Sequence, residues 1–320
     1  MSLTSNLTAI PQPSVAVIDI GSNSIKVLVA ALAADGGLEV LRHESLDARI
    51  SAGISAATPH LSEEGMARGL AAIEELLALA APYAPVRTLL VATSAVRDAA
   101  NGSEFRARVR AATGHEIRIL TGREEANGIG HGLTADRALA ALRDFYVFDL
   151  GGGSLECLEF RDREIQQELS LQLGCVRLTE KFVRDTSAPF SAESRAQIAA
   201  HVAATLRASS FRLGATRCAI GTGGTVATIR KIHGARVGLE AEQTASIVTL
   251  AEIRDLLDFL AALPLAERQR VAGLPAARAD VFPTALATIV AVAEAGGFTE
   301  FHHSFYNLRY GLATELLSSL

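Results

Sequence analysis

A stretch that occurs twice places the strongest constraint on how this chain can fold. Residues 15–28 read VAVIDIGSNSIKVL, and residues 145–158 read FYVFDLGGGSLECL. The residues that coincide at an offset of 130 include Asp19 with Asp149, Gly21 with Gly151, and Ser24 with Ser154. In each copy an apolar run leads into an Asp, and a turn of small residues leads into a second apolar run. The pattern predicts a buried strand, a tight glycine turn and a second strand, once in each of two related domains.

The chemistry that this unit predicts is phosphate binding. Glycine lets the backbone approach a ligand closely, and its N–H groups can point into one concavity. An Asp at the end of the buried strand is placed to hold Mg²⁺ or a water, because hard cations take oxygen ligands. The plain alternative is a β-hairpin whose Gly and Asn residues serve only the turn. Two copies with the same Asp and Gly favour a ligand in a cleft between two domains.

Composition narrows the classes of protein. At 320 residues the chain is longer than one typical core, and 49% hydrophobic content predicts a globular protein. A net charge of −5 argues against a nonspecific nucleic-acid binder. The first dozen residues lack the pattern of a signal peptide, and no apolar run reaches the roughly 18 residues of a membrane span. Cys157, Cys175 and Cys218 lack metal spacing and are interpreted as buried thiols in a reducing compartment, so we expect a cytoplasmic location.

The order of elements predicts an α/β fold that repeats. In the first half we expect strands at 15–20, 24–32, 38–49, 86–92 and 116–120, and helices at 62–81, at 102–113 and from 121–122 onward. In the second half we expect strands at 145–150, 154–160, 164–171 and 217–220, a glycine loop at 221–225, helices over much of 249–295, an extended segment at 300–304 and a last helix at 305–317.

This order predicts two domains. One spans 1–133, with a loose tail at 1–13, and the other spans 134–320. The last helix, within 305–320, is free to pack back on the first domain. Gly128, Gly130 and Gly132 near the boundary predict a hinge, because glycine relaxes the limits on the backbone.

Seven short motifs follow one another along the chain. They are DIGSNS at 19–24, ATSAVR at 92–97, GREEA at 122–126, DLGGGSLE at 149–156, LGCVRLTE at 173–180, GTGGT at 221–225 and RAD at 278–280. From about residue 15 to 316 the chain thereby resembles the exopolyphosphatase and guanosine pentaphosphate phosphohydrolase (Ppx/GppA) family of the actin, Hsp70 and sugar-kinase superfamily. The resemblance implies two ribonuclease H-like (actin-like ATPase) domains with an active-site cleft between them.

The resemblance also implies an activity and roles for residues. The family hydrolyses a terminal phosphoanhydride with water, which takes a base, donors to phosphate oxygens and usually Mg²⁺, with Mn²⁺ as an alternative. Glu125 corresponds to the catalytic base and Arg97 to a phosphate-clamping arginine. The implied phosphate-binding residues are Ser22, Asn23, Ser24, Gly151, Gly152, Gly153, Ser154, Gly223, Gly224 and Thr225. The implied metal ligands are Asp19, Asp149 and Glu156.

Simpler interpretations of these residues stay open. Spacing alone makes Glu124 and Glu125 first-turn acids that the helix dipole stabilises, and for Glu124 this remains our interpretation. Arg97 has Asp98 or Glu104 as alternative partners. Arg177, Lys181, Arg230 and Lys231 form either a basic path from the cleft or a solvated helix face. His302 and His303 are not expected to bind metal, because neighbouring residues on a strand face opposite ways.

The chain departs from the family pattern at three places. Leu155 replaces the usual Thr, and Pro283 to Ala285 stand where a Gly is common. The segment 50–53, with Ala52, lacks the acid of the family's Leu-Gly-Glu-Gly loop. These departures bear on metal geometry and chain-length preference rather than on the fold.

Two functional classes follow from the sequence. The first is a hydrolase that acts on inorganic polyphosphate or on guanosine pentaphosphate. The second is a regulatory protein that binds phosphate or nucleotide without turnover. A sugar-kinase-like phosphotransferase is a third option, which the GREEA segment disfavours. The expected partners are a phosphate substrate and, as an option, a second copy of the chain in a homodimer, with no nucleic acid and no membrane.

Overall fold

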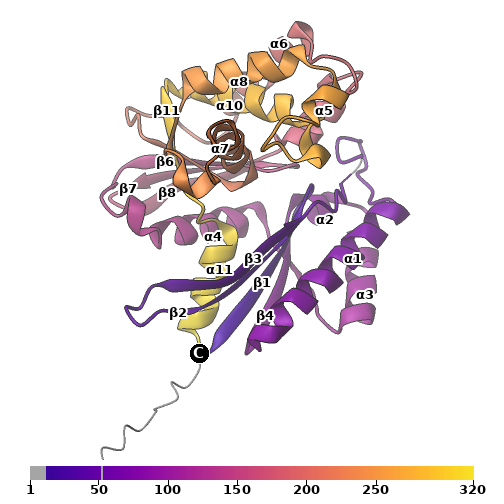
Figure 1. Cartoon of the computed structure of the whole chain (residues 1–320), viewed down its shortest axis with the longest axis vertical. Coiled ribbons are helices and arrows are strands. Elements are labelled where there is room, and N and C mark those ends of the chain that lie inside the picture. Colours follow the sequence, from indigo (N-terminus) through magenta and orange to yellow (C-terminus); the bar gives the residue numbers. More distant parts are fainter. Residues whose placement is uncertain (1–11, 52) are drawn as a thin grey trace, which may run out of the picture.

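The computed structural model of the chain describes residues 12–51 and 53–320. Ala52 and most of the tail predicted at 1–13 lie outside the described residues. Figure 1 shows two sheets, one in each half of the chain, with helices between them and on their outer sides. Two mixed sheets covered by helices confirm the predicted α/β class. Within the described part of the chain, no helix is both long and apolar enough to cross a bilayer.

The first half forms a five-stranded sheet in the order β3-β2-β1-β4-β5. Its strands are β1 (Ser14–Ile20), β2 (Ile25–Leu32), β3 (Leu38–Leu46), β4 (Arg87–Ala92) and β5 (Ile117–Ile119). Its helices are α1 (Glu63–Ala80), α2 (Ser94–Asp98), α3 (Gly102–Thr113) and α4 (Gly122–Thr134). Strand β1 is antiparallel to β2 and parallel to β4, so the hairpin turn and the end of β4 lie at one edge of the sheet. Two features differ from the prediction. Strand β3 ends at Leu46 and not at residue 49, and residues 94–98, for which no element was predicted, form helix α2.

The second half repeats this topology and adds one strand, in the order β10-β11-β9-β6-β7-β8. Its strands are β6 (Phe145–Leu150), β7 (Leu155–Arg161), β8 (Glu164–Leu171), β9 (Ala219–Thr222), β10 (Ile247–Thr249) and β11 (Glu300–His303). Its helices are α5 (Cys175–Phe182), α6 (Ala192–Ala208), α7 (Gly223–Val237), α8 (Leu250–Ala262), α9 (Leu265–Arg268), α10 (Phe282–Gly296) and α11 (Leu308–Ser318). Strand β6 is antiparallel to β7 and parallel to β9, as β1 is to β2 and β4.

Burial on both faces explains why the central strands are almost continuously apolar. Nearly every residue of β1, β2, β6 and β7 is buried, whereas the edge strand β3 keeps much of its surface exposed. Helices α1 and α3 lie on the outer side of the first sheet, and α6, α8 and α10 pack together beyond the second (Figure 1). A strand covered on both faces has no solvent side on which polar residues would alternate.

Helices α4 and α11 form the layer between the sheets. Helix α4 packs against β7 and β8, and α11 packs against β1 and β2. Each half of the chain therefore contributes a helix that packs on the sheet of the other half. One apolar cluster joins Val17 and Leu28 of the first sheet to Leu158 of the second through Ile129 and Leu312. We propose that the boundary between the two domains lies between residues 133 and 134, because all strands of the first sheet precede it and all strands of the second sheet follow it.

The glycines near this boundary, where we predicted a hinge, belong to a helix. Gly128, Gly130 and Gly132 lie within α4 and are buried. A Cβ atom on Gly132 would stand 2.2 Å from the carbonyl oxygen of Asn307, and one on Gly311 would stand 2.0 Å from that of Gly128. These glycines allow two helices to approach backbone to backbone, while the predicted hinge motion stays a prediction.

This close approach predicts a stability difference between two substitutions in α4. Ala favours a helix interior over Gly by about 1 kcal/mol at either position. At Gly132 the added methyl group meets backbone, so we expect Gly132→Ala to lower the free energy of unfolding by about 1–3 kcal/mol. At Gly130 it meets the ends of the Ile165, Leu158 and Phe160 side chains, which can shift. Gly130→Ala is therefore the matched control, with a smaller loss.

Urea denaturation of both variants and the wild type measures the difference. Equal stability of Gly132→Ala and Gly130→Ala would show that the two helices do not depend on the backbone contact.

Candidate active site

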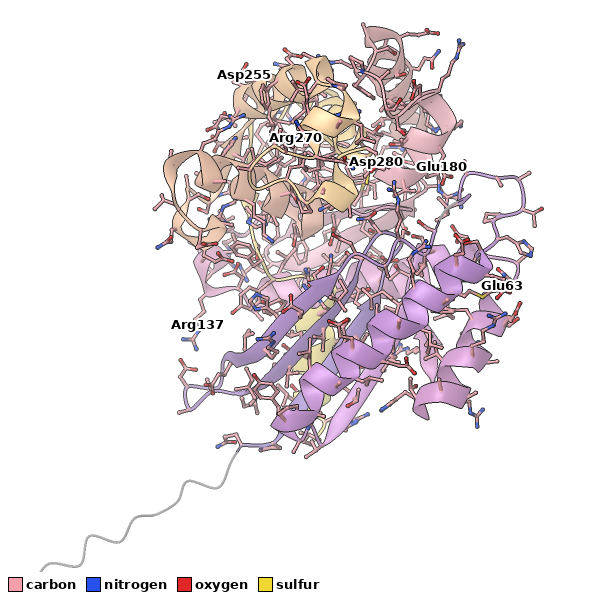
Figure 2. All side chains as sticks on the ribbon, turned by 45° about the vertical axis from the view of Figure 1, so that its right-hand side comes forward. Glu63, Arg137, Glu180, Asp255, Arg270 and Asp280 are labelled. Atoms are coloured by element: carbon pink, nitrogen blue, oxygen red, sulfur yellow. The ribbon has the colours of Figure 1, made fainter. Side chains whose placement is uncertain are left out.

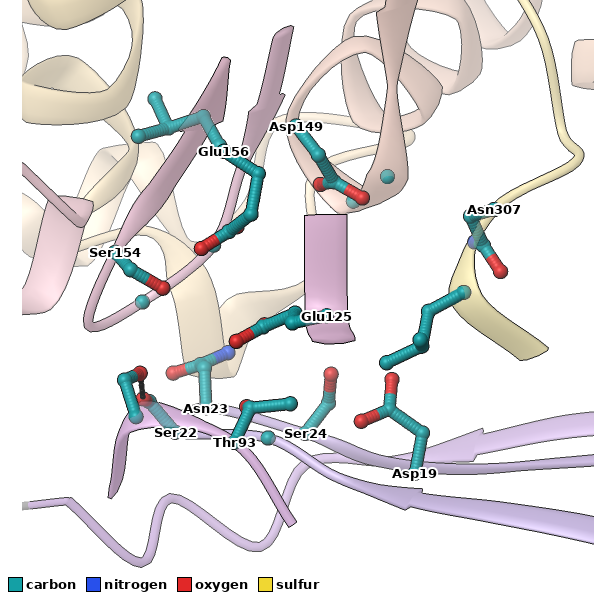
Figure 3. A pocket seen from close by; sticks show the side chains of 18 of the residues that line it. Asp19, Ser22, Asn23, Ser24, Thr93, Glu125, Asp149, Ser154, Glu156 and Asn307 are labelled. Atoms are coloured by element: carbon teal, nitrogen blue, oxygen red, sulfur yellow. Dashed lines mark hydrogen bonds between the residues drawn. The ribbon is translucent and has the colours of Figure 1, made fainter. Parts of the chain in front are cut away.

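The two glycine turns face one pocket between the sheets. The N–H of Gly21 donates to the carbonyl oxygen of Ser24 at 3.2 Å, and the N–H of Gly151 donates to that of Ser154 at 3.0 Å. Figure 3 shows Ser22 and Asn23 of the first turn across from Ser154 of the second. The repeat in the sequence is thus a pair of similarly closed turns whose small residues meet at one place.

The pocket encloses a cavity of about 90 Å³, which holds several water-sized groups. The predicted residues that line it are Asp19, Ser22, Asn23, Ser24, Glu125, Asp149, Gly151, Gly152, Ser154, Glu156, Gly223 and Gly224. The lining residues to which we assigned no role are Gly21, Lys26, Thr93, Ser94, Ile129, Leu150, Arg278, Asn307 and Leu308. Arg97, Gly153 and Thr225 were predicted for the site but do not line this pocket.

The predicted glycine loop at 221–225 is a strand end and a helix start. Strand β9 runs to Thr222, and α7 begins at Gly223. Gly223 has φ +76°, and a Cβ there would stand 2.0 Å from Oδ1 of Asp149, so only glycine fits. The Thr225 hydroxyl donates to the carbonyl oxygen of Leu150 at 3.0 Å and is fully buried. Its role in this structure is to fasten α7 to the second turn.

Glu124 follows the plain interpretation of a first-turn acid. Its carboxylate accepts from the N–H and hydroxyl of Thr121, which accepts from the N–H of Glu124 in return, so the pair forms a capping box. Arg118 donates to Glu124 at 2.7 Å and, with the Thr121 bonds, lowers the pKa of Glu124 to about 2. The side chain is directed to the helix start and not to the pocket.

Glu125 is the buried acid of the same turn. Its residue is only 6% exposed, and its Oε2 accepts a hydrogen bond from Nη1 of Arg97 at 3.0 Å. Burial raises the pKa of Glu125 well above its ordinary value, and Glu156 raises it further, while Arg97 opposes the change. A buried carboxylate with a raised pKa that faces a polar pocket has the properties of a general base.

Arg97 is hydrogen-bonded to Glu125. Besides Glu125, its Nη1 donates to the carbonyl oxygen of Leu120 at 2.9 Å, and its Nε lies 3.5 Å from Asp98. The guanidinium is outside the set of pocket-lining groups. These contacts position the Glu125 carboxylate, and the phosphate-clamping role of Arg97 stays a prediction.

The paired strands of each hairpin place one more ionisable residue opposite each Asp. Asp19 is paired with Lys26, and Asp149 is paired with Glu156. Burial is the main cause that raises the pKa of Asp149 to about 6. Burial is also the main cause that raises the pKa of Glu156 to about 7, and the charge of Asp149 raises the pKa of Glu156 further. Hydrogen bonds from Ser154 and Ser170 oppose the rise at Glu156.

Lys26 offsets part of the negative charge in the site. Burial, and then the charge of Arg309, lowers the pKa of Lys26, while Asp19 and Asp149 act in the other direction. Burial likewise raises the pKa of Asp19, against the charges of Lys26 and Arg309. The sequence could have indicated that Lys26 belongs to the site, because the offset of 130 that aligns the two repeats aligns Lys26 with Glu156.

The predicted metal ligands do not form a closed protein site. Among residues 12–51 and 53–320, no three His, Cys, Asp or Glu side chains come together as a metal-binding group. Asp149 and Glu156 nevertheless offer carboxylate oxygens whose raised pKa reflects uncompensated burial. Mg²⁺ is commonly held by one or two carboxylates and by substrate phosphates. The residues fit an open Mg²⁺ site that the substrate completes.

Asn23 provides unpaired polar atoms in the pocket. The residue is 7% exposed, and neither its side-chain oxygen nor its side-chain nitrogen has a partner within the described chain. Figure 3 shows its amide close to Glu125 and Ser22. Buried polar groups are nearly always paired in folded proteins, so this amide is available for a ligand.

Contacts between the halves close one side of the cleft. Arg177 donates to the carbonyl oxygens of Gly153 (3.0 Å) and Ile54 (2.8 Å) and to Asp98 (2.7 Å). Arg177 is buried, so it does not belong to a basic path on the surface.

Two acids of the second half complete this junction. Glu180 accepts from the N–H groups of Gly53 and Ser55, at 2.8 and 2.9 Å, and Asp280 pairs with Arg49. Figure 2 shows Glu180 and Asp280 where the two halves meet.

Comparison with known proteins identifies similar chains. A model of the Ppx/GppA phosphatase family matches residues 28–320. An exopolyphosphatase from Cytophaga hutchinsonii has a similar structure, with a TM-score of 0.85, 23% identity, and coverage of 96% of this chain and 98% of that one. The Aquifex aeolicus PPX-GPPA enzyme is also similar, with a TM-score of 0.76, 23% identity, and coverage of 95% and 100%. These structures confirm the predicted fold of two actin-like domains.

The raised pKa of Glu156 predicts how stability depends on pH. In the unfolded chain the Glu156 carboxyl has the ordinary pKa of about 4, and in the folded protein its pKa is about 7. Between these values the folded state binds more protons, so its free energy of unfolding falls as pH rises. Gln has no proton to lose. We expect Glu156→Gln to be about 1–3 kcal/mol more stable than the wild type at pH 8 in metal-free buffer.

At pH 5 the two proteins should be close in stability. Guanidinium denaturation at both pH values tests this, with the exposed Glu64→Gln as control. A stability gain of the same size at pH 5 and pH 8 would contradict the burial of an ionised Glu156.

Proposed function

Since the chain belongs to the Ppx/GppA phosphatase family, we propose that it is an exopolyphosphatase-type hydrolase that releases terminal phosphate from inorganic polyphosphate. The observation that carries the proposal is the placement of Glu125, a buried carboxylate in a pocket lined by both glycine turns. Hydrolysis of a phosphoanhydride needs little covalent help from the protein, but it needs positioning and charge stabilisation. Both are functions that this pocket supports.

In the proposed reaction a water attacks the terminal phosphorus atom. Glu125 accepts a proton from this water while the bond to the leaving phosphate chain breaks. Arg97 positions the carboxylate through its 3.0 Å hydrogen bond and limits the rise of its pKa. A base with a pKa raised toward the working pH accepts this proton more effectively than one with an ordinary pKa.

The turns and helix starts supply donors for the phosphate oxygens. Gly152 offers a backbone N–H group, and Ser22 and Asn23 offer side-chain donors. Helix α7 opens at Gly223 against the pocket, and the positive end of its dipole favours an anion. These groups would hold the terminal phosphate in position for attack.

Mg²⁺, or Mn²⁺ as an alternative, is part of the proposal. Asp149 and Glu156 would hold it, with Asp19 on the facing hairpin. When bound, the cation would neutralise charge on the phosphate oxygens. It would also lower the energy of the two buried carboxylates in their ionised form.

Two further candidates belong to the same site. Guanosine pentaphosphate carries the same kind of terminal phosphoanhydride, and its hydrolysis needs the same base and donors. A protein that binds phosphate or nucleotide without turnover would keep the donors but would not depend on Glu125. A colorimetric assay for released phosphate, with polyphosphate and guanosine pentaphosphate compared side by side, distinguishes all three.

We propose a cytoplasmic protein, and a homodimer is an option that gel filtration would test.

The two neighbouring acids of α4 give the sharpest test of the mechanism. Glu125→Gln keeps the volume of the side chain but cannot accept a proton. Loss of a general base lowers the rate by about 10²–10⁴, so we expect the turnover number to fall by that factor while polyphosphate still binds. Glu124→Gln changes only a capping box on the surface and is the matched control.

Steady-state phosphate release gives the turnover number, and calorimetric titration gives the affinity. Turnover by Glu125→Gln close to that of the wild type would reject Glu125 as the base.

A further inference from the structure

A chain of polar contacts leads from the second glycine turn to Glu125. Helix α5 begins directly against this turn, where the N–H of Cys175 donates to the carbonyl oxygen of Gly151 at 3.0 Å. Two residues further along, the side chain of Arg177 returns to the turn, and its Nε donates to the carbonyl oxygen of Gly153 at 3.0 Å. The position of Arg177 is therefore fixed by a turn whose residues line the pocket.

Arg177 extends from the second half of the chain to the first. Its Nη2 donates to Oδ2 of Asp98 at 2.7 Å, and its Nη1 donates to the carbonyl oxygen of Ile54 at 2.8 Å. Each of the three guanidinium nitrogen atoms thus has an acceptor. The Arg177 side chain is 10% exposed and the Asp98 side chain is 18% exposed. A charge-assisted hydrogen bond that is shielded from water in this way is stronger than one on the surface.

Asp98 lies between two arginines and places one carboxylate oxygen toward each. Its Oδ2 accepts from Arg177, while its Oδ1 lies 3.5 Å from Nε of Arg97. Through a different nitrogen, Nη1, the same Arg97 guanidinium donates to Oε2 of Glu125 at 3.0 Å. Asp98 and Arg177 do not line the pocket, so they can influence a reaction there only through other residues.

The plain alternative is that these contacts only fasten the two halves together. Glu180, in the next turn of α5, does so by accepting from the backbone N–H groups of Gly53 and Ser55, at 2.8 and 2.9 Å. Within the described part of the chain, no ion pair joins Glu180 to Arg97. Asp98 differs from Glu180, because its carboxylate ends beside the arginine that is bonded to Glu125.

We propose that Asp98 and Arg177 are positioning residues for Glu125 and that they act through Arg97. Arg177 fixes the carboxylate of Asp98 across the junction between the halves. Asp98 in turn fixes the guanidinium of Arg97, which holds Glu125 in place. Placement of the base thereby depends on contact between α5 of the second half and α2 of the first. The proposal rests on the proposed function only for the role of Glu125 as the base.

Two single variants each remove one link of this chain. Arg177→Gln and Asp98→Asn keep a hydrogen-bonding side chain but remove its charge. We expect each to lower the turnover number about 10- to 100-fold, as for misplacement of a catalytic group by on the order of 1 Å. KM for polyphosphate should stay near that of the wild type, because neither side chain lines the pocket. A wild-type turnover number in either variant overturns the proposal.

A double-variant cycle separates positioning from general damage to the fold. A residue that acts through Arg97 has no further effect on the turnover number once the Arg97 side chain is removed, whereas independent losses multiply. We therefore expect the double variant Arg97→Ala/Arg177→Gln to have about the turnover number of Arg97→Ala alone. A loss equal to the product of the two single losses overturns the proposal.

Glu180→Gln is the matched control on the same helix. Glu180 also lies where the halves meet (Figure 2), and the substitution weakens its bonds to the first half without changing the link to Arg97. We expect a turnover number near that of the wild type. A loss as large as that of Arg177→Gln overturns the proposal, because the junction as a whole would then be responsible.

A crystal structure of ligand-free Asp98→Asn shows the position of Arg97 without any reaction. It also covers the case in which Arg177→Gln fails to fold, since Asp98 is the more exposed of the two residues. We expect the hydrogen bond between Nη1 of Arg97 and Glu125 to be lost or longer than in the wild type. Retention of this bond with wild-type geometry overturns the proposal.

These measurements also separate the positioning role from the function. If the wild type releases no phosphate from polyphosphate or guanosine pentaphosphate, the proposed function fails. The position of Arg97 in the crystal structure of Asp98→Asn still decides whether Asp98 positions it.

Discussion

The backbone contact between α4 and α11 is the constraint on which the site depends. Both helices lie between the sheets, and glycines at their contact leave no side chain in the way. Helix α4 carries Glu125 in its first turn, while Asn307 caps α11 and Arg309 lies in its first turn. Because each helix packs on the sheet of the other half, their separation sets the distance between the hairpins. Glu125 and the two glycine turns are therefore positioned by one set of contacts.

Burial of charge is the cost of this arrangement. Four carboxylates, from Asp19, Glu125, Asp149 and Glu156, line one small pocket, and burial raises the pKa of each. Lys26, Arg97 and Arg309 offset only part of this energy. A site built in this way is less stable when empty than a packed apolar core would be, because charge is expensive to bury without a partner. The same lack of compensation favours the binding of a cation together with a phosphate.

The two hairpins share a backbone pattern but differ in charge. Lys26 stands opposite Asp19 in the first, and Glu156 stands opposite Asp149 in the second. The first hairpin thus presents a cation beside its acid, which suits phosphate oxygens, while the second presents two acids, which suit a metal ion. One repeated element therefore presents two different charge patterns through a single position.

Local sequence was enough to predict most of the elements and both hairpin turns, although it did not predict α2 or β10. Apolar runs that end in Asp and Gly predicted the hairpins, and their repetition predicted the two related sheets. The capping role of Glu124 was also predictable, because it involves residues within one helical turn.

Tertiary structure decided the rest. The contacts of Gly132 and Arg97 depend on partners that are distant in the sequence, Asn307 and Glu125. A glycine in a boundary segment predicts flexibility until the helix that packs on it is known. The sequence around Arg97 likewise does not reveal that its guanidinium meets the Glu125 carboxylate. Sequence determines what each side chain is able to do, and packing decides which neighbour it meets, because burial and hydrogen bonding are properties of the assembled core.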